Sequence, residues 1–462
     1  MNSSGSTGYE VMELVDCLKQ QEGKTLEFKE NCSSLPKIVQ TVAAFANTAG
    51  GTLIIGIRDK TNEVVGIADP LKEEERLSNA FADGIHPLMI PDIRISSFRD
   101  RNLITISVPH VAGPYYVRSE GPEKGVYVRL GSTNRRAGPE IIEAIRRLAR
   151  NISFDEQPCT EINSEDIDFR VASEFFESVS RKLTQAIRKT LGLIVNHGGK
   201  DVPSLGAVLL FGKNRRQLFP DAVIRCARFQ GLGTARFLDQ MEIDEYLPKA
   251  VEAVIAFIER HTLQSAEIGR VRRHDIPEYP YLAVREAVIN AIVHADYAIT
   301  GMNIKVAIFD NRIEITSPGA LPFGLTLESA LSGVSKLRNR VIGRVFRELK
   351  LIEQWGTGLN RIISACQDHG QQPPRFEEIG TTFRVTLFSQ PVQDRKLPYW
   401  HTRLMAHFAE YEEITTKEAA QIWNTSDRTA RTRLRNLLEQ GHIVEIGTGP
   451  KDPKKVYVLK RK

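Results

Sequence analysis

Apolar residues recur along the chain at spacings that switch between those of strands and those of helices. Leu26 and Phe28 alternate with charged residues, which predicts a strand, and apolar residues at helical spacing after Ile38 predict a helix. Gly50-Gly51 ends that helix, and the apolar run 52–57 predicts a buried strand. Further elements are expected as strands near 92–98, 103–108 and 125–130 and as a helix near 139–148. The pattern predicts the α/β class, as an α+β multidomain chain.

Changes in composition divide the chain into regions. Residues 151–166 are polar and acidic, and residues 389–398 are polar, so both stretches are expected to be linkers. We therefore expect a mixed α/β module at 10–150, a linker and connector region at 151–245, a second α/β domain at 246–390 and a separate tail at 398–462.

The overall composition excludes several classes of protein. With 462 residues, 41% apolar and 26% charged, the chain is neither a disordered nor a disulfide-framework protein. Its net charge is only +5, so any nucleic-acid site must come from a local concentration of charge. The five cysteines are scattered, which is typical of a reducing compartment, and no apolar run is long enough for a membrane helix. We expect a cytoplasmic protein.

The tail carries the pattern of a helix-turn-helix followed by two strands. Thr415 and Glu418 match a capping box that begins a short helix. The next helix aligns three arginines on one face, Arg428, Arg431 and Arg435. Strands near 443–446 and 456–459 enclose a basic turn that includes Lys454 and Lys455. This geometry predicts a winged helix whose basic residues bind DNA, although a solvated arginine face or a protein-interaction module would share the pattern.

The segment 281–294 predicts a buried helix with one polar stripe. It is apolar on nearly every side, while Glu286, Asn290 and His294 lie four residues apart on one line. Buried polar side chains need partners, because leaving one unpaired costs about 1–3 kcal/mol. A bound ligand or metal ion is one way to supply those partners.

This spacing resembles the first motif of the GHKL ATP-binding fold that gyrase, histidine kinases and the mismatch-repair protein MutL share. The segment Trp355-Gly-Thr-Gly358 resembles the family's second glycine box, and Thr381 begins a segment that resembles its closing strand. The resemblance implies an α/β sandwich that binds ATP and Mg²⁺. It assigns Mg²⁺ to Asn290 and water activation to Glu286, and it places the nucleotide against His294, Gly319, Gly356, Gly358 and Thr381.

The chain departs from the GHKL pattern at one position. Ser317 stands where the family has an aspartate that reads the adenine amino group. A fold that keeps the shape without the nucleotide is therefore an open alternative to ATP binding or weak ATP hydrolysis. The sequence is most similar to the divergent branch named after the C-terminal part of RecG helicase, but it lacks helicase motor motifs, so helicase activity is not expected.

The N-terminal region resembles the Schlafen AlbA_2 domain, also described as divergent AAA-4, a DNA-binding module. The resemblance rests on Leu-Glu-Phe-Lys at 26–29 and on the segment 44–57, Ala-Phe-Ala-Asn-Thr-Ala-Gly-Gly-Thr-Leu-Ile-Ile-Gly-Ile. It implies phosphate contacts from Arg129, Arg135 and Arg136.

Three acidic positions of this region also match nucleolytic Schlafen proteins. Glu22, Glu27 and Asp59 would hold Mg²⁺ or Mn²⁺ if the chain brought them together. The alternative is that Glu27 pairs with Lys29 or Arg58 and has no catalytic role.

The order of these parts resembles that of transcriptional regulators. The first hypothesis is a DNA-binding regulator in which ATP in the central domain couples two nucleic-acid-binding ends. DNA is favoured over RNA, a homodimer or higher oligomer is expected, and no membrane partner is expected. The second hypothesis is a metal-dependent nuclease that cleaves RNA or DNA, acting in phage defence. The third is an interaction scaffold with vestigial sites.

Overall fold

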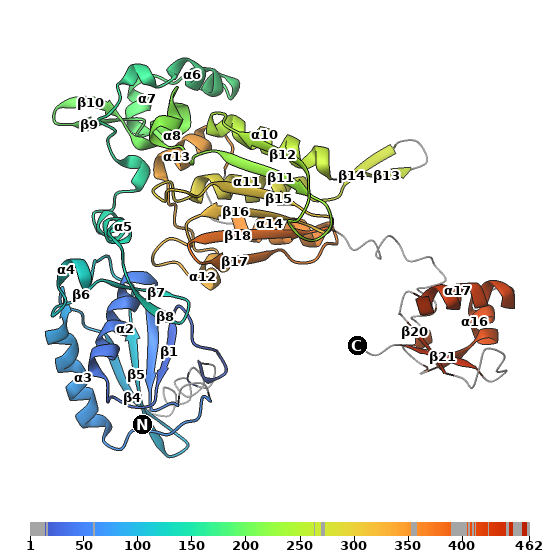
Figure 1. The fold of residues 1–462 in the computed structure, drawn as a ribbon, viewed down its shortest axis with the longest axis horizontal. Coiled ribbons are helices and arrows are strands. Elements are labelled where there is room, and N and C mark those ends of the chain that lie inside the picture. Colours follow the sequence, from blue (N-terminus) through green and yellow to red (C-terminus); the bar gives the residue numbers. More distant parts are fainter. Residues whose placement is uncertain are drawn as a thin grey trace, which may run out of the picture. The chain divides into compact units, whose positions relative to one another are not determined.

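The computed structural model forms two compact units, residues 1–389 and 390–462 (Figure 1). Each unit is described by itself below. The structure describes residues 14, 17–58, 61–262, 264–268, 273–352, 358–389, 404, 407–408, 411, 413–423, 425–439, 443–446 and 455–459.

A four-stranded sheet of order β1-β2-β5-β4 forms the N-terminal module. β1 (Leu26–Lys29) pairs in parallel with β2 (Gly51–Ile55), and α2 (Leu35–Thr48) makes the crossover between them. β5 (Arg101–Val108) and β4 (Asp92–Phe98) add antiparallel strands. The apolar side of α2 packs on this sheet, with Phe45 fully buried. These elements confirm the expected α/β class.

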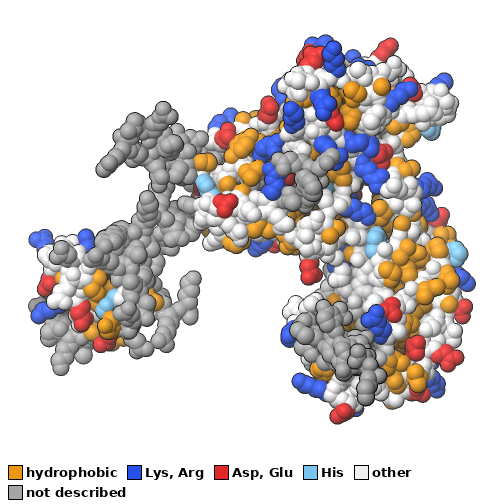
Figure 2. Space-filling model, turned by 180° about the vertical axis from the view of Figure 1, so that it is seen from behind, with side chains coloured by type: hydrophobic (Ala, Val, Ile, Leu, Met, Phe, Trp, Pro, Cys, Tyr) orange, Lys and Arg blue, Asp and Glu red, His pale blue; other side chains and the backbone are white. Residues whose placement is uncertain are grey.

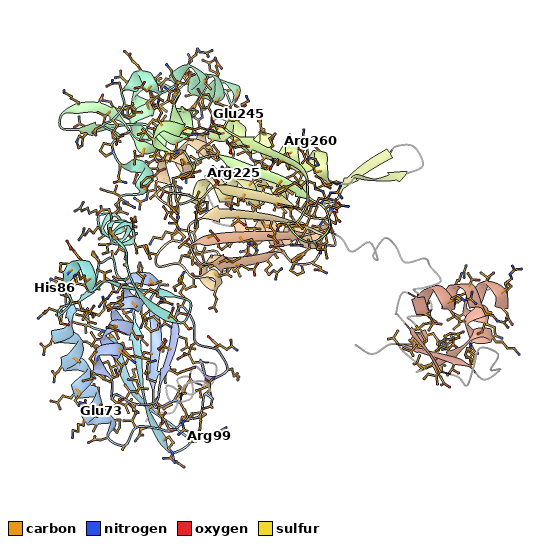
Figure 3. The ribbon with its side chains drawn as sticks, viewed as in Figure 1. Glu73, His86, Arg99, Arg225, Glu245 and Arg260 are labelled. Carbon is orange, nitrogen blue, oxygen red and sulfur yellow. The ribbon has the colours of Figure 1, made fainter. Side chains whose placement is uncertain are left out.

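The rest of the N-terminal module surrounds the sheet. It contains α3 (Pro70–Gly84), β3 (Ile85–His86), β6 (Tyr116–Val117), α4 (Gly121–Lys124), β7 (Tyr127–Leu130), β8 (Thr133–Arg136) and α5 (Pro139–Ala149). The strands β3 and β6 pair, and the ring of His86, labelled in Figure 3, lies 5.2 Å from that of Tyr116. The apolar pattern did not indicate α3, because Leu77 and Phe81 are the only residues it buries.

The segment expected as a linker is packed into the structure. Asp155 is fully buried, and its two carboxylate oxygens accept the backbone N–H groups of Arg340 and Ile342 at 2.9 Å each. These amides lie in the first turn of α13 (Arg340–Glu348), so Asp155 caps that helix from a distant part of the chain. Residues 163–218 follow as short helices and one hairpin: α6 (Phe169–Ser178), α7 (Gln185–Thr190), β9 (Ile194–His197), β10 (Lys200–Pro203), α8 (Leu205–Phe211) and α9 (Arg215–Leu218).

A six-stranded sheet forms the centre of the larger unit, with the order β12-β11-β15-β16-β18-β17. Its strands are β11 (Ile224–Phe229), β12 (Phe237–Ile243), β15 (Ile304–Ile308), β16 (Arg312–Pro318), β17 (Arg375–Ile379) and β18 (Thr382–Phe388). β11 pairs with β15 in parallel, and the other pairs are antiparallel. The sheet therefore begins before residue 246, where the sequence pattern had placed the start of the domain.

Helices cover one face of this sheet. α10 (Leu247–His261) contacts β11 and β15, α11 (Tyr281–His294) contacts β16, and α14 (Gly358–Asp368) packs on α11. On β16, Ile313, Ile315 and Ser317 are buried while the residues between them are only half-buried, as the period of two predicts. The remaining elements are the hairpin β13 (Gln264–Ile268) and β14 (Arg273–Pro277) and the short helix α12 (Leu327–Leu331).

The smaller unit pairs two helices with a three-stranded sheet. β19 (Glu413–Thr415) precedes α16 (Thr416–Ile422) and α17 (Asp427–Glu439), and β20 (Ile443–Ile446) and β21 (Val456–Leu459) complete the sheet in the order β19-β21-β20. Its core includes Leu404, Ile414, Ala430, Leu434, Leu437 and Tyr457. Across the part of the chain that the structure describes, no helix has the length and apolar character needed to cross a bilayer.

Candidate functional site

The polar stripe on α11 opens into a cavity of about 360 Å³. Glu286, Asn290 and His294 all line it, as the sequence spacing predicts for a ligand site. Strands β16 and β18 form the sheet side of the cavity through Ile315, Ser317, Phe383 and Val385. Because the rest of α11 is buried among apolar side chains, the helix holds its three polar groups in fixed positions.

The N-terminus of α14 lies against two members of the stripe. A Cβ atom added to Gly358 would lie 2.8 Å from Glu286 Oε1 and 2.9 Å from Asn290 Nδ2, so any larger residue here would displace these two polar groups. The first backbone N–H groups of a helix have no partner within the helix, and the helix dipole there favours anions. A phosphate group is the ligand that such a terminus suits best.

The charges that line the cavity add to this preference. Glu286 is buried, and its Oε2 lies 3.7 Å from Arg361 Nη1. Lys336 and Arg347 also line the cavity, so three cations accompany one carboxylate among the described lining residues. Burial, with a smaller contribution from Arg340, lowers the pKa of Lys336.

The sequence motifs do not single out Arg347 or Arg361 as functional residues. A signal was present for Arg361, which follows Gly358 by three residues and therefore lies on the same face of the first turn of α14.

His294 closes the other end of the stripe. Burial, together with the nearby Arg338 guanidinium, lowers the pKa of His294 to about 4, so the imidazole is neutral at neutral pH. Arg338 is held by Asp296, with Nη1 and Oδ2 3.0 Å apart, and by the carbonyl oxygen of Ala320. The cavity therefore has a neutral polar group at this end.

Of the two glycine-box positions Gly319 and Gly356, the structure describes only Gly319. Gly319 lines the cavity with φ +94°, and an added Cβ would lie 2.8 Å from Cβ of Asp296. Gly356 lies outside the described residues.

Thr381 was expected to contact the nucleotide, but it is exposed and is not among the lining residues. Its carbonyl oxygen instead accepts the N–H of Gly319 at 2.7 Å, because Thr381 belongs to the turn before β18. Thr381 is therefore a residue that positions the glycine box.

A Mg²⁺ ion fits this cavity only in the presence of phosphates. Mg²⁺ usually takes one or two protein oxygens, with phosphate oxygens and waters completing its shell. The amide oxygen of Asn290 and the carboxylate of Glu286 lie side by side at Gly358 and can supply such ligands. Among the described residues, no group of three or more His, Cys, Asp or Glu side chains could hold a metal ion without phosphate.

The acidic residues of the N-terminal module have other partners. Glu27 is buried, and its Oε2 lies 2.8 Å from Nη1 of Arg129, whose side chain is fully buried. Lys29 also bonds to Glu27, and Glu22 Oε1 accepts the backbone N–H of Phe28 at 2.7 Å. Asp59 lies outside the described residues. As placed, Glu22 and Glu27 do not suit a divalent cation, because Arg129 and Lys29 already neutralise Glu27.

The three basic residues expected to contact phosphate in this module differ in exposure. Arg129 is buried beneath Glu27, with its guanidinium 4.9 Å from the centre of the Phe45 ring, so it cannot reach a nucleic acid in this conformation. Arg136 bonds to Glu120 at 2.7 Å and lies over the Tyr127 ring. Arg135 is exposed, and its side chain forms no hydrogen bond or ion pair with the described residues. Burial of Arg129 corrects its assignment as a phosphate contact.

In the smaller unit, the sequence pattern is reproduced closely. Thr415 and Glu418 form the expected capping box at the start of α16. Arg428, Arg431 and Arg435 are exposed on α17, on the side opposite the buried Ala430 and Leu434. Lys455 pairs with Glu445 at 2.8 Å, and Lys454 lies outside the described residues. The three arginines are therefore available to a ligand.

A single segment, residues 319–338, lines the cavity and also contacts the N-terminal module. Its Gly324 donates its N–H to the Thr48 carbonyl oxygen at 2.6 Å. Phe323 packs on the cluster that includes Val126 and Ile145. On the cavity side, the segment contributes Gly319, Ala320, Leu321, Pro322, Leu325, Ala330, Val334, Ser335, Lys336 and Leu337.

Glu378 of β17 contacts both the 319–338 segment and the N-terminal module. Its Oε1 accepts the Leu321 N–H at 2.8 Å and lies 2.9 Å from Lys24 Nζ of the N-terminal module. Figure 2 shows lysine and arginine side chains spread over the visible face of the larger unit, among acidic and apolar side chains.

Comparison with known proteins gives two family matches. Residues 22–138 match the family described as "Schlafen, AlbA_2", and residues 301–387 match the family described as "Putative ATP-dependent DNA helicase recG C-terminal". No curated protein matches the chain.

Two solved structures are similar to parts or all of the chain. The DIP2311 protein from Corynebacterium diphtheriae is 21% identical, with 97% of this chain and 96% of that chain covered and a TM-score of 0.44. The N-terminal domain of a RecG-related protein from Nitrosomonas europaea is 26% identical, with 26% of this chain and 91% of that chain covered and a TM-score of 0.22. By its family matches, the chain joins a segment of the Schlafen AlbA_2 type to an ATPase-like segment of the RecG C-terminal type.

Proposed function

We propose that the protein is a DNA-binding regulator whose central cavity binds a nucleoside triphosphate with Mg²⁺, and that nucleotide binding alters how its ends engage DNA. The observation that carries the proposal is the meeting of Glu286, Asn290 and the α14 N-terminus at Gly358. The RecG C-terminal family match covers β16, α14 and β18, which contribute lining residues to the cavity.

The triphosphate would lie at the Gly358 end of the cavity. Its charge is complemented there by the helix N-terminus and by Arg361. Asn290 would hold Mg²⁺ against the phosphates, and the ion would neutralise charge on them. Glu286 is the only carboxylate among the described lining residues, so it is the candidate base for hydrolysis.

The 319–338 segment supports coupling to the N-terminal module. A ligand in the cavity contacts one side of this segment, while Thr48 and Glu378 hold the other side. A ligand changes a conformational equilibrium only if it binds the two conformations with different affinity. Nucleotide that pulls the segment inward would therefore weaken its contacts with the N-terminal module.

The smaller unit is proposed to be the DNA reader. The order β19-α16-α17-β20-β21 is that of a winged helix, in which the second helix of the pair enters the major groove. Arg428, Arg431 and Arg435 would then contact phosphates or base edges from α17. A homodimer would place two such helices on a two-fold symmetric DNA site.

The first experiment measures thermal unfolding of the full chain with ATP and Mg²⁺. A ligand at 100 times its Kd stabilises the folded state by about 2.7 kcal/mol. Wild type should show this shift, Asn290→Ala should lose most of it, and Asn214→Ala, at an exposed position away from the cavity, should keep it. No shift in the wild type would refute nucleotide binding.

A second experiment tests coupling through Gly324. Its φ is +80°, and an added Cβ would lie 2.3 Å from Cδ2 of His110, so Gly324→Ala should separate the segment from the N-terminal module. Duplex DNA affinity, measured by fluorescence anisotropy, should change with ATP in wild type and change less in Gly324→Ala, while ATP affinity stays measurable. Equal nucleotide effects in both proteins would refute this route of coupling.

A further inference from the structure

The end of the cavity away from α14 has a different chemical character from the phosphate end. Glu286 and His294 are eight residues apart on one helix, which corresponds to about 12 Å along its axis. Ser317 lies near the His294 end, because the N–H of Asp296 donates to the carbonyl oxygen of Pro318 at 2.8 Å. This inference rests on the proposed function, since a triphosphate at Gly358 leaves this end of the cavity to the nucleobase.

Two polar groups at this end have no side-chain hydrogen-bond partner among the residues that the structure describes. Ser317 is only 5% exposed and its side chain lines the cavity, yet its hydroxyl has no hydrogen bond to any described residue. The imidazole of His294 likewise lines the cavity without a hydrogen bond to the described residues. The cavity lining also includes the apolar residues Ala291, Ile315, Leu337, Phe383 and Val385, and the Arg338 guanidinium lies close to His294. A ligand edge that reaches this end therefore meets two neutral polar groups beside apolar side chains.

Both groups can act as donor or acceptor. A serine hydroxyl donates one hydrogen bond and accepts others, and a neutral imidazole has one donor and one acceptor nitrogen. Position 6 of adenine carries an amino group that donates, whereas position 6 of guanine carries an oxygen that accepts. A carboxylate would serve only the amino group, but the sole carboxylate among the described lining residues is Glu286, at the phosphate end.

We propose that the cavity takes purine nucleoside triphosphates without selecting between the 6-amino and the 6-oxo edge, so that GTP binds about as well as ATP. Ser317 is the residue that sets this tolerance. Rotation of its hydroxyl pairs it with either the 6-amino or the 6-oxo group, so the group at position 6 is paired in both nucleotides; an unpaired buried polar group is the usual source of strong discrimination.

The test is a comparison of ATP and GTP dissociation constants on the full-length wild-type protein with Mg²⁺, by calorimetry. The expected ratio is within about tenfold, which is 1.4 kcal/mol. A larger ratio in favour of either nucleotide overturns the inference while leaving nucleotide binding intact. Binding of neither nucleotide refutes the proposed function itself, so the two failures are distinguishable.

Variants on β16 test whether Ser317 determines the ratio of ATP to GTP affinity. Ser317→Asp should create a preference for ATP over GTP of at least about tenfold, because the new carboxylate only accepts hydrogen bonds. Thr316→Asp places the same charge one residue away, at a position that does not line the cavity, and should leave the ratio unchanged. An unchanged ratio in a folded Ser317→Asp protein would show that this residue does not contact the base and would overturn the assignment.

Discussion

The buried ion pair of Glu27 and Arg129 predicts that replacement of Glu27 destabilises the N-terminal module, whether or not the residue has a catalytic role. The Arg129 side chain is fully buried and lies 2.8 Å from the Glu27 carboxylate. Glu27→Gln would leave the guanidinium with neutral acceptors only, the Gly23 carbonyl at 2.6 Å and Asn134 Oδ1 at 3.0 Å. Leaving a buried charge without its counter-ion costs about 3–5 kcal/mol. Because these acceptors remain, we expect a loss of about 3 kcal/mol.

The assay is hydrogen exchange of the β1, β2 and β7 amides, which reports the opening of this module alone. Glu27→Gln and Arg129→Met should each lower the protection, and the double variant should lose less than the sum of the two by at least about 1 kcal/mol. Glu30→Gln removes a carboxylate that lies 3.6 Å from Arg58 in an exposed pair, and should cost less than about 1 kcal/mol. Additive losses, or a stable Glu27→Gln variant, would refute the structural role of the pair and reopen Glu27 as a catalytic candidate.

Three further predictions follow from the cavity and the tail. Gly358→Ala should abolish the thermal shift with ATP, because its Cβ would lie 2.8 Å from Glu286 Oε1, whereas Gly233→Ala, which meets nothing within 4 Å, should not; equal shifts would contradict the placement of the phosphates. Because the pKa of His294 is about 4 in the folded protein and about 6.5 in the unfolded chain, only the unfolded chain gains a proton at this residue as the pH falls from 6.5 to 4. Over that range, wild type should lose up to about 3 kcal/mol more stability than His294→Gln; parallel pH profiles of unfolding would count against this. Replacement of Arg428, Arg431 and Arg435 by glutamine should flatten the salt dependence of DNA binding by about one unit per lost phosphate contact, and an unchanged slope would exclude α17 as the reader.

Local signals in the sequence predicted several features correctly. The capping box at Thr415 and Glu418 and the bounds of the buried helix 281–294 depend on residues a few positions apart. The polar stripe of Glu286, Asn290 and His294 was recognisable for the same reason, since helical spacing alone places the three on one face.

Features that depend on distant contacts could not be read from the sequence. Arg129 looked like a surface cation, but the pairing of β7 with β8 and the packing of α2 place it beneath Glu27. Asp155 looked like part of a polar linker, yet it caps α13 almost two hundred residues away. The contribution of β11 and β12 to the central sheet was also missed, because strand pairing between residues 224 and 304 leaves no local trace.

The position of β11 determines where the larger unit can be divided. A fragment that starts at residue 246 would lose both β11 and β12, so β15 would become a bare strand edge with unpaired backbone groups. It would also lose Asp155 from the start of α13. Such a truncated piece should aggregate, whereas a piece that begins near residue 151 would keep both features and is the better fragment for isolating the six-stranded sheet with its cavity.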